Sequence, residues 1–233
     1  MSVSELVLVR HGQSTANVDA ADAADASQAS KPSSTRRSVR DPDVALTELG
    51  ERQSAAVGRW LATLPAGAAP EAVWSSPYRR AAETTRIAMT AAGLSGPARL
   101  DERLRDREAG VTDGATGGEI QGLWSQESER RRRLGKFYYR PPGGESWADV
   151  ALRVRFFLAD LDRAGARRVL IVSHDTPIVV IRYACQGLSE AEVLALEKTS
   201  PLRNASVSRL IRTADGWSVA EYNTVAHLSG IDW

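Results

Sequence analysis

Two histidines follow short apolar runs of the sequence. His11 comes after residues 6–9, with Arg10 between, and His174 comes shortly after residues 169–172. A neutral imidazole, with an ordinary pKa of about 6.5, is a competent nucleophile toward phosphorus near pH 7. The planar guanidinium of an arginine matches the oxygens of a phosphate. The pair Arg10 and His11 therefore indicates phosphate chemistry where a buried strand ends.

Neither histidine segment is specific alone, because a histidine after a strand is more often a structural or surface residue. The signal comes from three segments that occur together in the order LVRHGQSTAN, SSPYRRAAET and VLIVSHD. This set resembles the histidine phosphatase superfamily, also called the phosphoglycerate mutase-like family, in its smaller, intracellular branch. The segments LTELGERQ, PPGGESWADV and NASVSRL resemble that branch too, so the likeness runs over nearly the whole chain.

The resemblance implies a role for each residue of the motifs. His11 would be the nucleophile that becomes phosphohistidine, while Arg10, Arg80 and His174 would hold the phosphoryl group and Asn17 would hydrogen-bond to it. Such a cradle stabilises the charge on the three equatorial oxygens during transfer, so the resemblance implies neither a metal nor another cofactor.

The arginine of the second motif is expected to be Arg80 and not its neighbour Arg79. The family's arginine stands directly before Ala-x-Gln/Glu-Thr, and Arg80 precedes Ala-Ala-Glu-Thr here. Arg79 is expected to be a surface cation.

A carboxylic acid must protonate the leaving alkoxide. The family places it in a Leu-Arg-Glu-x-x-x-Gly segment, which matches residues 104–110 and puts Asp106 in the place of the usual Glu. Because Asp is one methylene shorter, either the backbone approaches more closely or Glu108 takes the role. Asp175 is a third candidate, because His-Asp is a donor signature of the larger acid-phosphatase branch. We predict Asp106 as the general acid and base.

Other function classes have weaker support. A cofactor-dependent phosphoglycerate mutase would share the phosphohistidine, but such mutases usually carry Trp where this chain has Ala16. A non-catalytic phosphate-binding module is disfavoured by the intact motif residues. The 3 histidines are not paired at the spacing of helical metal ligands, and no nucleotide-binding glycine loop is present. We therefore predict a hydrolase of small phosphorylated molecules.

The elements that must position these residues alternate between strands and helices. Besides the runs at 6–9 and 169–172, strands are expected at residues 73–74, 206–211 and 217–222. This order predicts a three-layer α/β sandwich with a mostly parallel central sheet and helices on both faces. Ligands bind beyond the carboxyl ends of the strands in such sheets, where both histidines fall.

Boundary signals mark three helices. Thr47 is expected to cap the first, and Ser76 to cap the second, with Pro77 at its first helical position and Gly93 beyond its end. A third helix, ended by Gly165, is predicted from apolar residues at helical spacing: Trp147, Val150, Val154, Phe157 and Leu161.

Size and charge favour one ordinary globular domain over residues 1–233. The formal net charge of +1 provides no field that would gather nucleic acid or an anionic membrane. The N-terminal residues fit neither a signal peptide nor a membrane span, and the one cysteine, Cys185, excludes an internal disulfide and is expected to be packed inside. These features predict a cytoplasmic protein.

Two segments do not follow the alternation. Residues 19–41 are expected to form a mobile loop, and residues 112–140 a variable cap segment in which 126–140 is a charged helix. Trp124 and residues 137–139 are candidates for a homodimer interface. Because specificity in the family resides in variable loops, the identity of the substrate stays open.

Overall fold

The computed structural model describes residues 2–20, 39–65, 67–114 and 125–231. These residues contain a six-stranded sheet of order β3-β2-β4-β1-β5-β6. Strands β1 to β4 run parallel to one another, and β5 runs antiparallel to both of its neighbours, β1 and β6. Their bounds are β1 (Glu5–Arg10), β2 (Ala72–Ser75), β3 (Arg99–Leu100), β4 (Arg168–Ser173), β5 (Val207–Thr213) and β6 (Gly216–Thr224).

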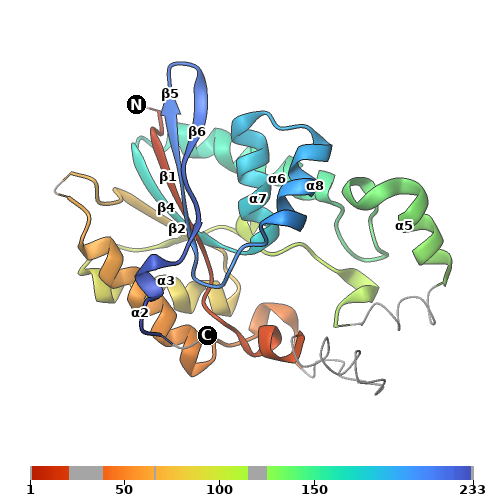
Figure 1. The fold of residues 1–233 in the computed structure, drawn as a ribbon, viewed down its shortest axis with the longest axis horizontal. Helices are drawn as coiled ribbons and strands as arrows, with labels where there is room; N and C mark the ends of the chain where they lie inside the picture. The colour runs from red at the N-terminus through yellow and green to blue at the C-terminus, as the bar shows by residue number, and fades with distance from the viewer. Residues whose placement is uncertain (1, 21–38, 66, 115–124, 232–233) are drawn as a thin grey trace.

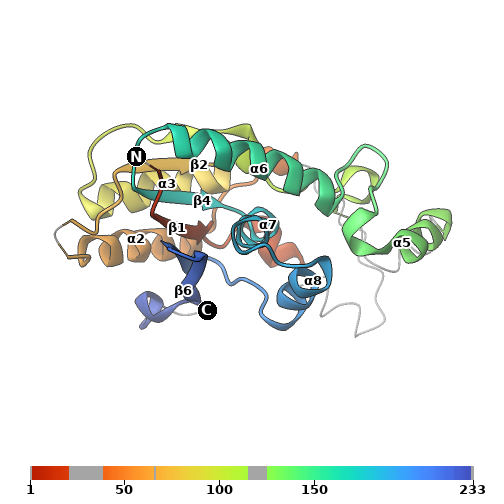
Figure 2. The same cartoon turned by 90° about the horizontal axis from the view of Figure 1, so that it is seen from above.

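Helices cover both faces of this sheet (Figures 1 and 2). Leu6 and Leu8 of β1 pack in one cluster with α6 (Trp147–Arg163) and α7 (Asp175–Gln186). Val7 and Val9 point to the other face and pack with α2 (Glu48–Ala62) and α3 (Arg79–Ala92). This alternation along the strand buries both of its faces. The predicted three-layer α/β sandwich is confirmed.

The position of β4 brings the two histidines together. Strand β4 lies between β1 and β2, so that β1 and β4 are parallel neighbours whose carboxyl ends meet at one edge of the sheet. His11 and His174 follow these two ends. The neighbouring strands explain why segments that are more than 160 residues apart in the sequence share one site.

The helix boundaries agree with the sequence except at one start. The Thr47 side chain accepts a hydrogen bond from the Gly50 amide, and Gly93 ends α3 in the left-handed conformation with φ 66°. The prediction that Ser76 caps α3 was wrong, because Tyr78 is the N-cap residue and the helix begins at Arg79. The hydroxyl of Ser76 instead lies against His174, as described below.

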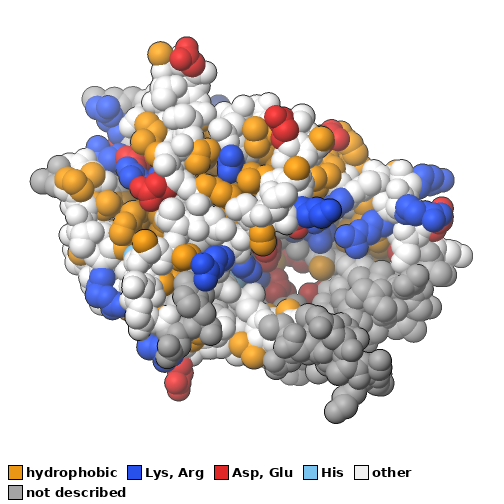
Figure 3. All heavy atoms as spheres, viewed as in Figure 1, with side chains coloured by type: hydrophobic (Ala, Val, Ile, Leu, Met, Phe, Trp, Pro, Cys, Tyr) orange, Lys and Arg blue, Asp and Glu red, His pale blue; other side chains and the backbone are white. Residues whose placement is uncertain are grey.

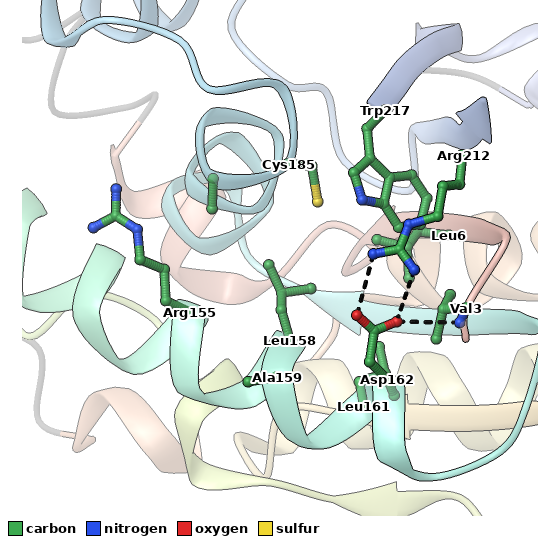
Figure 4. A pocket seen from close by; sticks show the side chains of 11 residues that line it. Val3, Leu6, Arg155, Leu158, Ala159, Leu161, Asp162, Cys185, Arg212 and Trp217 are labelled. Atoms are coloured by element: carbon green, nitrogen blue, oxygen red, sulfur yellow. Dashed lines mark hydrogen bonds and ion pairs between the residues drawn. The ribbon is translucent and has the colours of Figure 1, made fainter. Parts of the chain in front are cut away.

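Helix α6 begins at a capping box in which Ser146 and Asp149 bond each other's backbone amides. Its far end is tied to the β5–β6 hairpin and to the N-terminal residues. Asp162 accepts a hydrogen bond from the backbone amide of Val3 at 3.1 Å and pairs with Arg212 (Figure 4). Val3, Asp162 and Arg212 line a cavity of about 280 Å³ together with Cys185. Cys185 is partly buried, and burial raises the pKa of its thiol to about 12. This cysteine is therefore a packing residue.

The two irregular segments lie partly outside the described residues. Of the expected loop 19–41, residues 21–38 are not described, residues 15–20 are helical, and Asp41–Asp43 forms a short 3₁₀ helix. Of the cap segment, residues 115–124 are not described, which includes Trp124, and α5 (Ser125–Tyr138) is helical with a break at Gly135.

Helix α5 lies beside α6 and α8 (Glu190–Thr199) at the edge of the molecule (Figure 1). The expectation that residues 137–139 are exposed as an interface was wrong for two of them. Phe137 and Tyr139 are only 5% and 8% exposed, whereas Tyr138 is 53% exposed. Phe137 packs in the core cluster with Trp147, and the Tyr139 hydroxyl donates to Glu127 of α5. None of the helices in the described ranges is both long and apolar enough to cross a membrane.

Candidate active site

His11 lies at the centre of the site with its ring oriented by two hydrogen bonds. The side chain is 2% exposed. Its Nδ1 lies 2.7 Å from the Gly12 carbonyl oxygen, to which it donates, and its Nε2 accepts from Nε of Arg80 at 3.3 Å. Burial, followed by the charges of Arg10 and Arg80, lowers its pKa well below 6.5. The imidazole is therefore neutral at pH 7 and carries its lone pair on Nε2.

The loop that carries His11 is held by close backbone packing. The Gly12 amide donates to Thr84 Oγ1 of α3 at 3.0 Å. A Cβ on Gly12 would lie 2.4 Å from the carbonyl oxygen of Gly50, at the start of α2. Glycine is required here because the catalytic loop and α2 approach more closely than a side chain allows.

Arg80 joins three parts of the site through its guanidinium. It is 3% exposed, and besides Nε on His11 its Nη2 donates to Oδ2 of Asp106 at 3.1 Å. Its Nη1 and Nη2 also bond the Asp41 carboxylate, at 3.0 and 3.2 Å. Arg79 by contrast is exposed and pairs with Glu83. No sequence signal pointed to Asp41 as a site residue, because it is the last residue of the segment 19–41 that was expected to be a mobile loop.

His174 lies beside His11, with 5.0 Å between the ring centroids. It is completely buried, its Nε2 lies 2.8 Å from the Ser76 hydroxyl, and its pKa is lowered, first by burial and then by nearby charge. Its Nδ1 has no hydrogen-bond partner among the described residues and lies 3.5 Å from Oδ2 of Asp106. An orphaned buried ring nitrogen at this place is suited to a phosphoryl oxygen.

Asp106 is the carboxylate that reaches both Arg80 and His174. Burial and the neighbouring Asp175 raise the pKa of Asp106 to about 6, against the opposing charge of Arg80. Its backbone is held from α6, where Arg153 Nη2 donates to the Asp106 carbonyl oxygen at 3.0 Å and Nη1 to that of Arg103 at 2.6 Å. A carboxyl group that titrates near neutrality can both give and take a proton.

The two rival donors have other partners. Glu108 accepts a hydrogen bond from the Tyr78 hydroxyl at 2.7 Å, and its side chain is 43% exposed. Asp175 accepts from the backbone amide of Thr176 at 2.6 Å and lies 3.6 Å from Arg10 Nη2. Asp106 contacts Arg80 although its side chain is shorter than the usual Glu, and Arg153 holds its backbone through the carbonyl oxygen.

The remaining predicted ligands are Arg10, directly before His11, and Asn17, which is linked to the His11 backbone through Asn204. Arg10 Nη1 donates to the Leu202 carbonyl oxygen at 2.5 Å, and its buried Nε lacks a partner within the described ranges. Asn17 accepts with Oδ1 from the amide and hydroxyl of Ser14 and from Nδ2 of Asn204, so its side-chain oxygen is engaged within the protein. Asn204 also donates to the His11 carbonyl oxygen at 3.2 Å. In the sequence, only the likeness of the segment NASVSRL to the family had drawn attention to Asn204.

The structure thus gathers all six predicted site residues around His11: Arg10, His11, Asn17, Arg80, Asp106 and His174. Sequence reasoning missed four residues that hold them: Asp41, Ser76, Arg153 and Asn204. The arrangement offers a neutral nucleophilic nitrogen, two guanidinium groups and a carboxyl group with a raised pKa. Together these groups can bind and transfer a phosphoryl group.

Comparison with known proteins supports this assignment. A 2,3-bisphosphoglycerate-dependent phosphoglycerate mutase of Methylobacterium radiotolerans is 33% identical over 196 residues, which cover 82% of this chain and 84% of that protein. A mycobacterial glucosyl-3-phosphoglycerate phosphatase has a TM-score of 0.72 at 27% identity, covering 95% of this chain and 99% of that one. The same phosphatase in complex with VO3 has a TM-score of 0.71 at 28% identity, covering 96% and 100%.

The family model named histidine phosphatase superfamily (branch 1) matches residues 6–225, a range that contains every residue of the site. The chain therefore belongs to the histidine phosphatase superfamily.

Proposed function

We propose that this protein is a metal-independent phosphomonoester hydrolase that acts through a phosphohistidine on His11. The observation that carries the proposal is the orientation of the neutral His11 ring, whose Nε2 lone pair lies against Arg80 while Asp106 bonds the same guanidinium. Arg80, a proposed ligand of the phosphoryl group, therefore contacts both the proposed nucleophile and the proposed proton donor.

The reaction proceeds in two displacements. His11 Nε2 forms a bond to phosphorus as the bond to the ester oxygen breaks, and Asp106 transfers its proton to that oxygen. The Asp106 carboxylate then takes a proton from a water molecule, whose oxygen bonds to phosphorus as the P–N bond breaks. Phosphate leaves, and both residues return to their starting states.

The other site residues stabilise the transferred group. Arg10 and Arg80 offer guanidinium donors to its oxygens, and His174 Nδ1 and the Asn17 amide are placed to add hydrogen bonds. Loss of one preorganised donor costs roughly 100- to 1,000-fold in rate. We expect losses of that order for Arg80→Ala and His174→Ala, no effect of chelators, and inhibition by vanadate.

A mutase is the second candidate, because the relative from Methylobacterium radiotolerans carries that name. A mutase must return the phosphoryl group to an organic acceptor and exclude water. Ala16, at a place where such mutases usually carry Trp, and the similarity to a phosphatase of known structure support hydrolysis.

The experiment that tests the proposal traps the intermediate. Brief reaction with a phosphorylated substrate, quenched without acid, should yield an acid-labile and base-stable phosphoenzyme that is absent in His11→Ala. Phosphate release should vanish in the same variant. Full activity of His11→Ala would refute the mechanism, and interconversion of phosphoglycerates faster than phosphate release would assign the protein to the mutases.

A further inference from the structure

Arg80 uses every N–H group of its guanidinium in this structure. An arginine side chain carries five N–H donors in one plane. Nε donates to His11 Nε2 at 3.3 Å, and Nη1 donates to the carbonyl oxygen and to Oδ1 of Asp41 at 2.7 and 3.0 Å. Nη2 donates to Oδ2 of Asp41 at 3.2 Å and to Oδ2 of Asp106 at 3.1 Å. Asp41 therefore accepts more of these hydrogen bonds than any other residue.

These bonds divide the guanidinium of Arg80 into two edges. The terminal edge, Nη1 and Nη2, bonds both carboxylate oxygens of Asp41, and such a bidentate contact fixes the plane of the group as well as its position. The inner edge, Nε and Nη2, bonds His11 and Asp106. Once His11 Nε2 is bonded to phosphorus it no longer accepts a hydrogen bond, so that Nε–H is available to a phosphoryl oxygen. Asp41 thus turns the inner edge toward the reaction.

The segment that carries Asp41 is anchored to the loop that follows His11. Asp41–Asp43 forms the 3₁₀ helix, and residues 45–47 pair with residues 13–15 through two backbone hydrogen bonds of 3.0 and 3.1 Å and an isolated β-bridge. The Asp41 side chain is 22% exposed, and that of Arg80 is 4% exposed. A largely buried ion pair held from the nucleophile's own loop is suited to keep a fixed geometry.

Other carboxylates lie near the guanidinium of Arg80. Asp41, Asp106 and Asp175 line one cavity of about 240 Å³ beside the catalytic residues. Figure 3 shows acidic atoms within a hollow near the middle of this face. If Asp41 did not hold the terminal edge, that edge would be open to Asp106. A full ion pair between Arg80 and Asp106 would keep the proposed proton donor ionised.

The protonation of Asp106 depends on charges from several elements. These are Arg80 of α3, Asp175 of α7, His174 at the N-cap of α7, Arg153 of α6 at its backbone and Asp41 of the 3₁₀ helix. Burial and then Asp175 raise the pKa of Asp106 to about 6, with a smaller contribution from Asp41 and against the charge of Arg80. The Asp41 carboxylate therefore offsets the cation that favours the ionised form of Asp106.

We propose that Asp41 is a positioning residue of the phosphoryl transfer, which holds the terminal edge of Arg80 so that the inner edge faces His11 and the phosphoryl group, and which offsets the charge of Arg80 beside Asp106. The inference rests on the proposed function, because it assumes that Arg80 is a ligand of the phosphoryl group. In this role Asp41 acts only through Arg80. Its effect on the rate must therefore depend on the presence of that side chain.

A double-mutant cycle tests this dependence. We expect Asp41→Asn to lower kcat on p-nitrophenyl phosphate about 10- to 100-fold, less than the loss for removal of Arg80 itself. In the Arg80→Ala background the same change should cost less than about twofold, because the side chain through which Asp41 acts is gone. Equal losses in both backgrounds would overturn the proposal. A faster Asp41→Asn enzyme would do so as well, since Asp41 would then compete with the phosphoryl group for Arg80.

The pH profile provides a readout that a merely structural role would not change. In Asp41→Asn the decline of kcat/KM for glycerol 3-phosphate, which follows the loss of the Asp106 proton, should move to a pH lower by about 0.5 to 1. Asp41→Glu keeps the charge, so its decline should stay at the wild-type pH, and its rate should lie between those of the wild type and Asp41→Asn. An unchanged profile in Asp41→Asn, or an Asp41→Glu rate no higher than that of Asp41→Asn, would contradict the proposal.

Asp43→Asn is the matched control for these experiments. It removes the same charge from the same 3₁₀ helix, where the exposed Asp43 side chain pairs with Arg40. Neither the rate nor the pH profile should change. A shift as large as that of Asp41→Asn would show that the contact with Arg80 is not responsible.

Hydrogen exchange separates the positioning of Arg80 from the proposed function. The Nε–H proton of Arg80, bonded to the buried His11, should exchange slowly with water in NMR spectra of the wild type and Asp43→Asn, and its signal is identified by its absence in Arg80→Ala. We expect exchange at least about tenfold faster in Asp41→Asn. If this difference is present but the wild-type protein releases no phosphate from any ester, the proposed function fails and the positioning stands. Equal exchange in the wild type and Asp41→Asn would overturn the positioning even in an active enzyme.

Discussion

Under the proposed mechanism, the difference between leaving groups depends on Asp106. An aryl oxygen such as p-nitrophenolate departs without a proton, whereas an alkoxide needs one. We expect Asp106→Asn to lower the hydrolysis of alkyl phosphates by about 100- to 10,000-fold, the usual worth of general acid catalysis, with a far smaller loss on p-nitrophenyl phosphate. Steady-state rates on the two substrate types measure this.

Asp175→Asn is the matched control for that experiment. It removes the same charge next to His174, from a side chain that bonds Thr176 and lies near Arg10. Its loss should be modest and equal for both leaving groups. A selective loss in Asp175→Asn instead would make Asp175 the donor, and the absence of selectivity in both variants would point to Glu108.

The raised pKa of Asp106 also predicts the pH profile. The general acid must be protonated in the free enzyme, and its pKa of about 6 means that the protonated fraction falls as the pH rises above that value. We therefore expect kcat/KM for an alkyl phosphate to decline above about pH 6 in the wild-type protein. The same substrate should show no such limb in Asp106→Asn, which has no proton to lose. The same decline of kcat/KM in the variant would mean that another group titrates.

At the scale of elements, α6 determines where Asp106 lies. Arg153 reaches from this helix to the carbonyl oxygens of Arg103 and Asp106, and Glu145 in turn pairs with Arg153 at 3.0 Å. Arg153 is thus a positioning residue, because it contacts the backbone of the donor segment and not the predicted phosphoryl ligands. Helix α6 therefore positions the proposed proton donor through Arg153.

We expect Arg153→Gln to lower alkyl phosphate hydrolysis about 10- to 100-fold and to change p-nitrophenyl phosphate hydrolysis much less. A purely structural role would lower both rates together. Arg155→Gln removes an exposed arginine from the same helix and serves as the control, with no expected change in either rate. Equal losses on both substrates in Arg153→Gln would contradict the positioning role.

For the whole molecule, the burial of His11 and His174 and the partial burial of His227 make stability depend on pH. Burial lowers the pKa of His11, His174 and His227 below 6.5, so below that pH the unfolded chain binds more protons than the folded protein. Stability must therefore fall as the pH drops through about 6.5. Asp106, with a pKa raised to about 6, binds its proton more tightly in the folded protein and offsets part of the fall below pH 6.

Thermal unfolding between pH 7.5 and 5 should show this fall as a lower Tm at the acid end. Each of the two fully buried rings contributes up to about 1.4 kcal/mol per pH unit. The decrease in Tm per pH unit should be smaller in His11→Asn, because this variant lacks one of the titrating groups. A Tm that rises as the pH falls over this range would contradict the burial of neutral histidines.

Local patterns in the sequence were sufficient to predict the fold class and to name residues that the structure brings together with His11. Two apolar runs followed by histidines indicated parallel strands with their chemistry at the carboxyl ends, because both faces of such strands are buried. Thr47 and Gly93 marked helix ends through short-range backbone requirements that do not depend on the rest of the fold. The motif order then identified the family.

Only the tertiary structure decided which groups surround these residues. The start of α3 moved from Ser76 to Arg79 because the Ser76 hydroxyl lies against His174, a contact across 98 positions that no local pattern encodes. The contact of Asp41 with Arg80 and the hold of Arg153 on Asp106 likewise join distant segments. Propensity and capping act within a few residues, whereas burial and charge act between neighbours in space. The set of partners around each site residue is therefore a property of the folded chain.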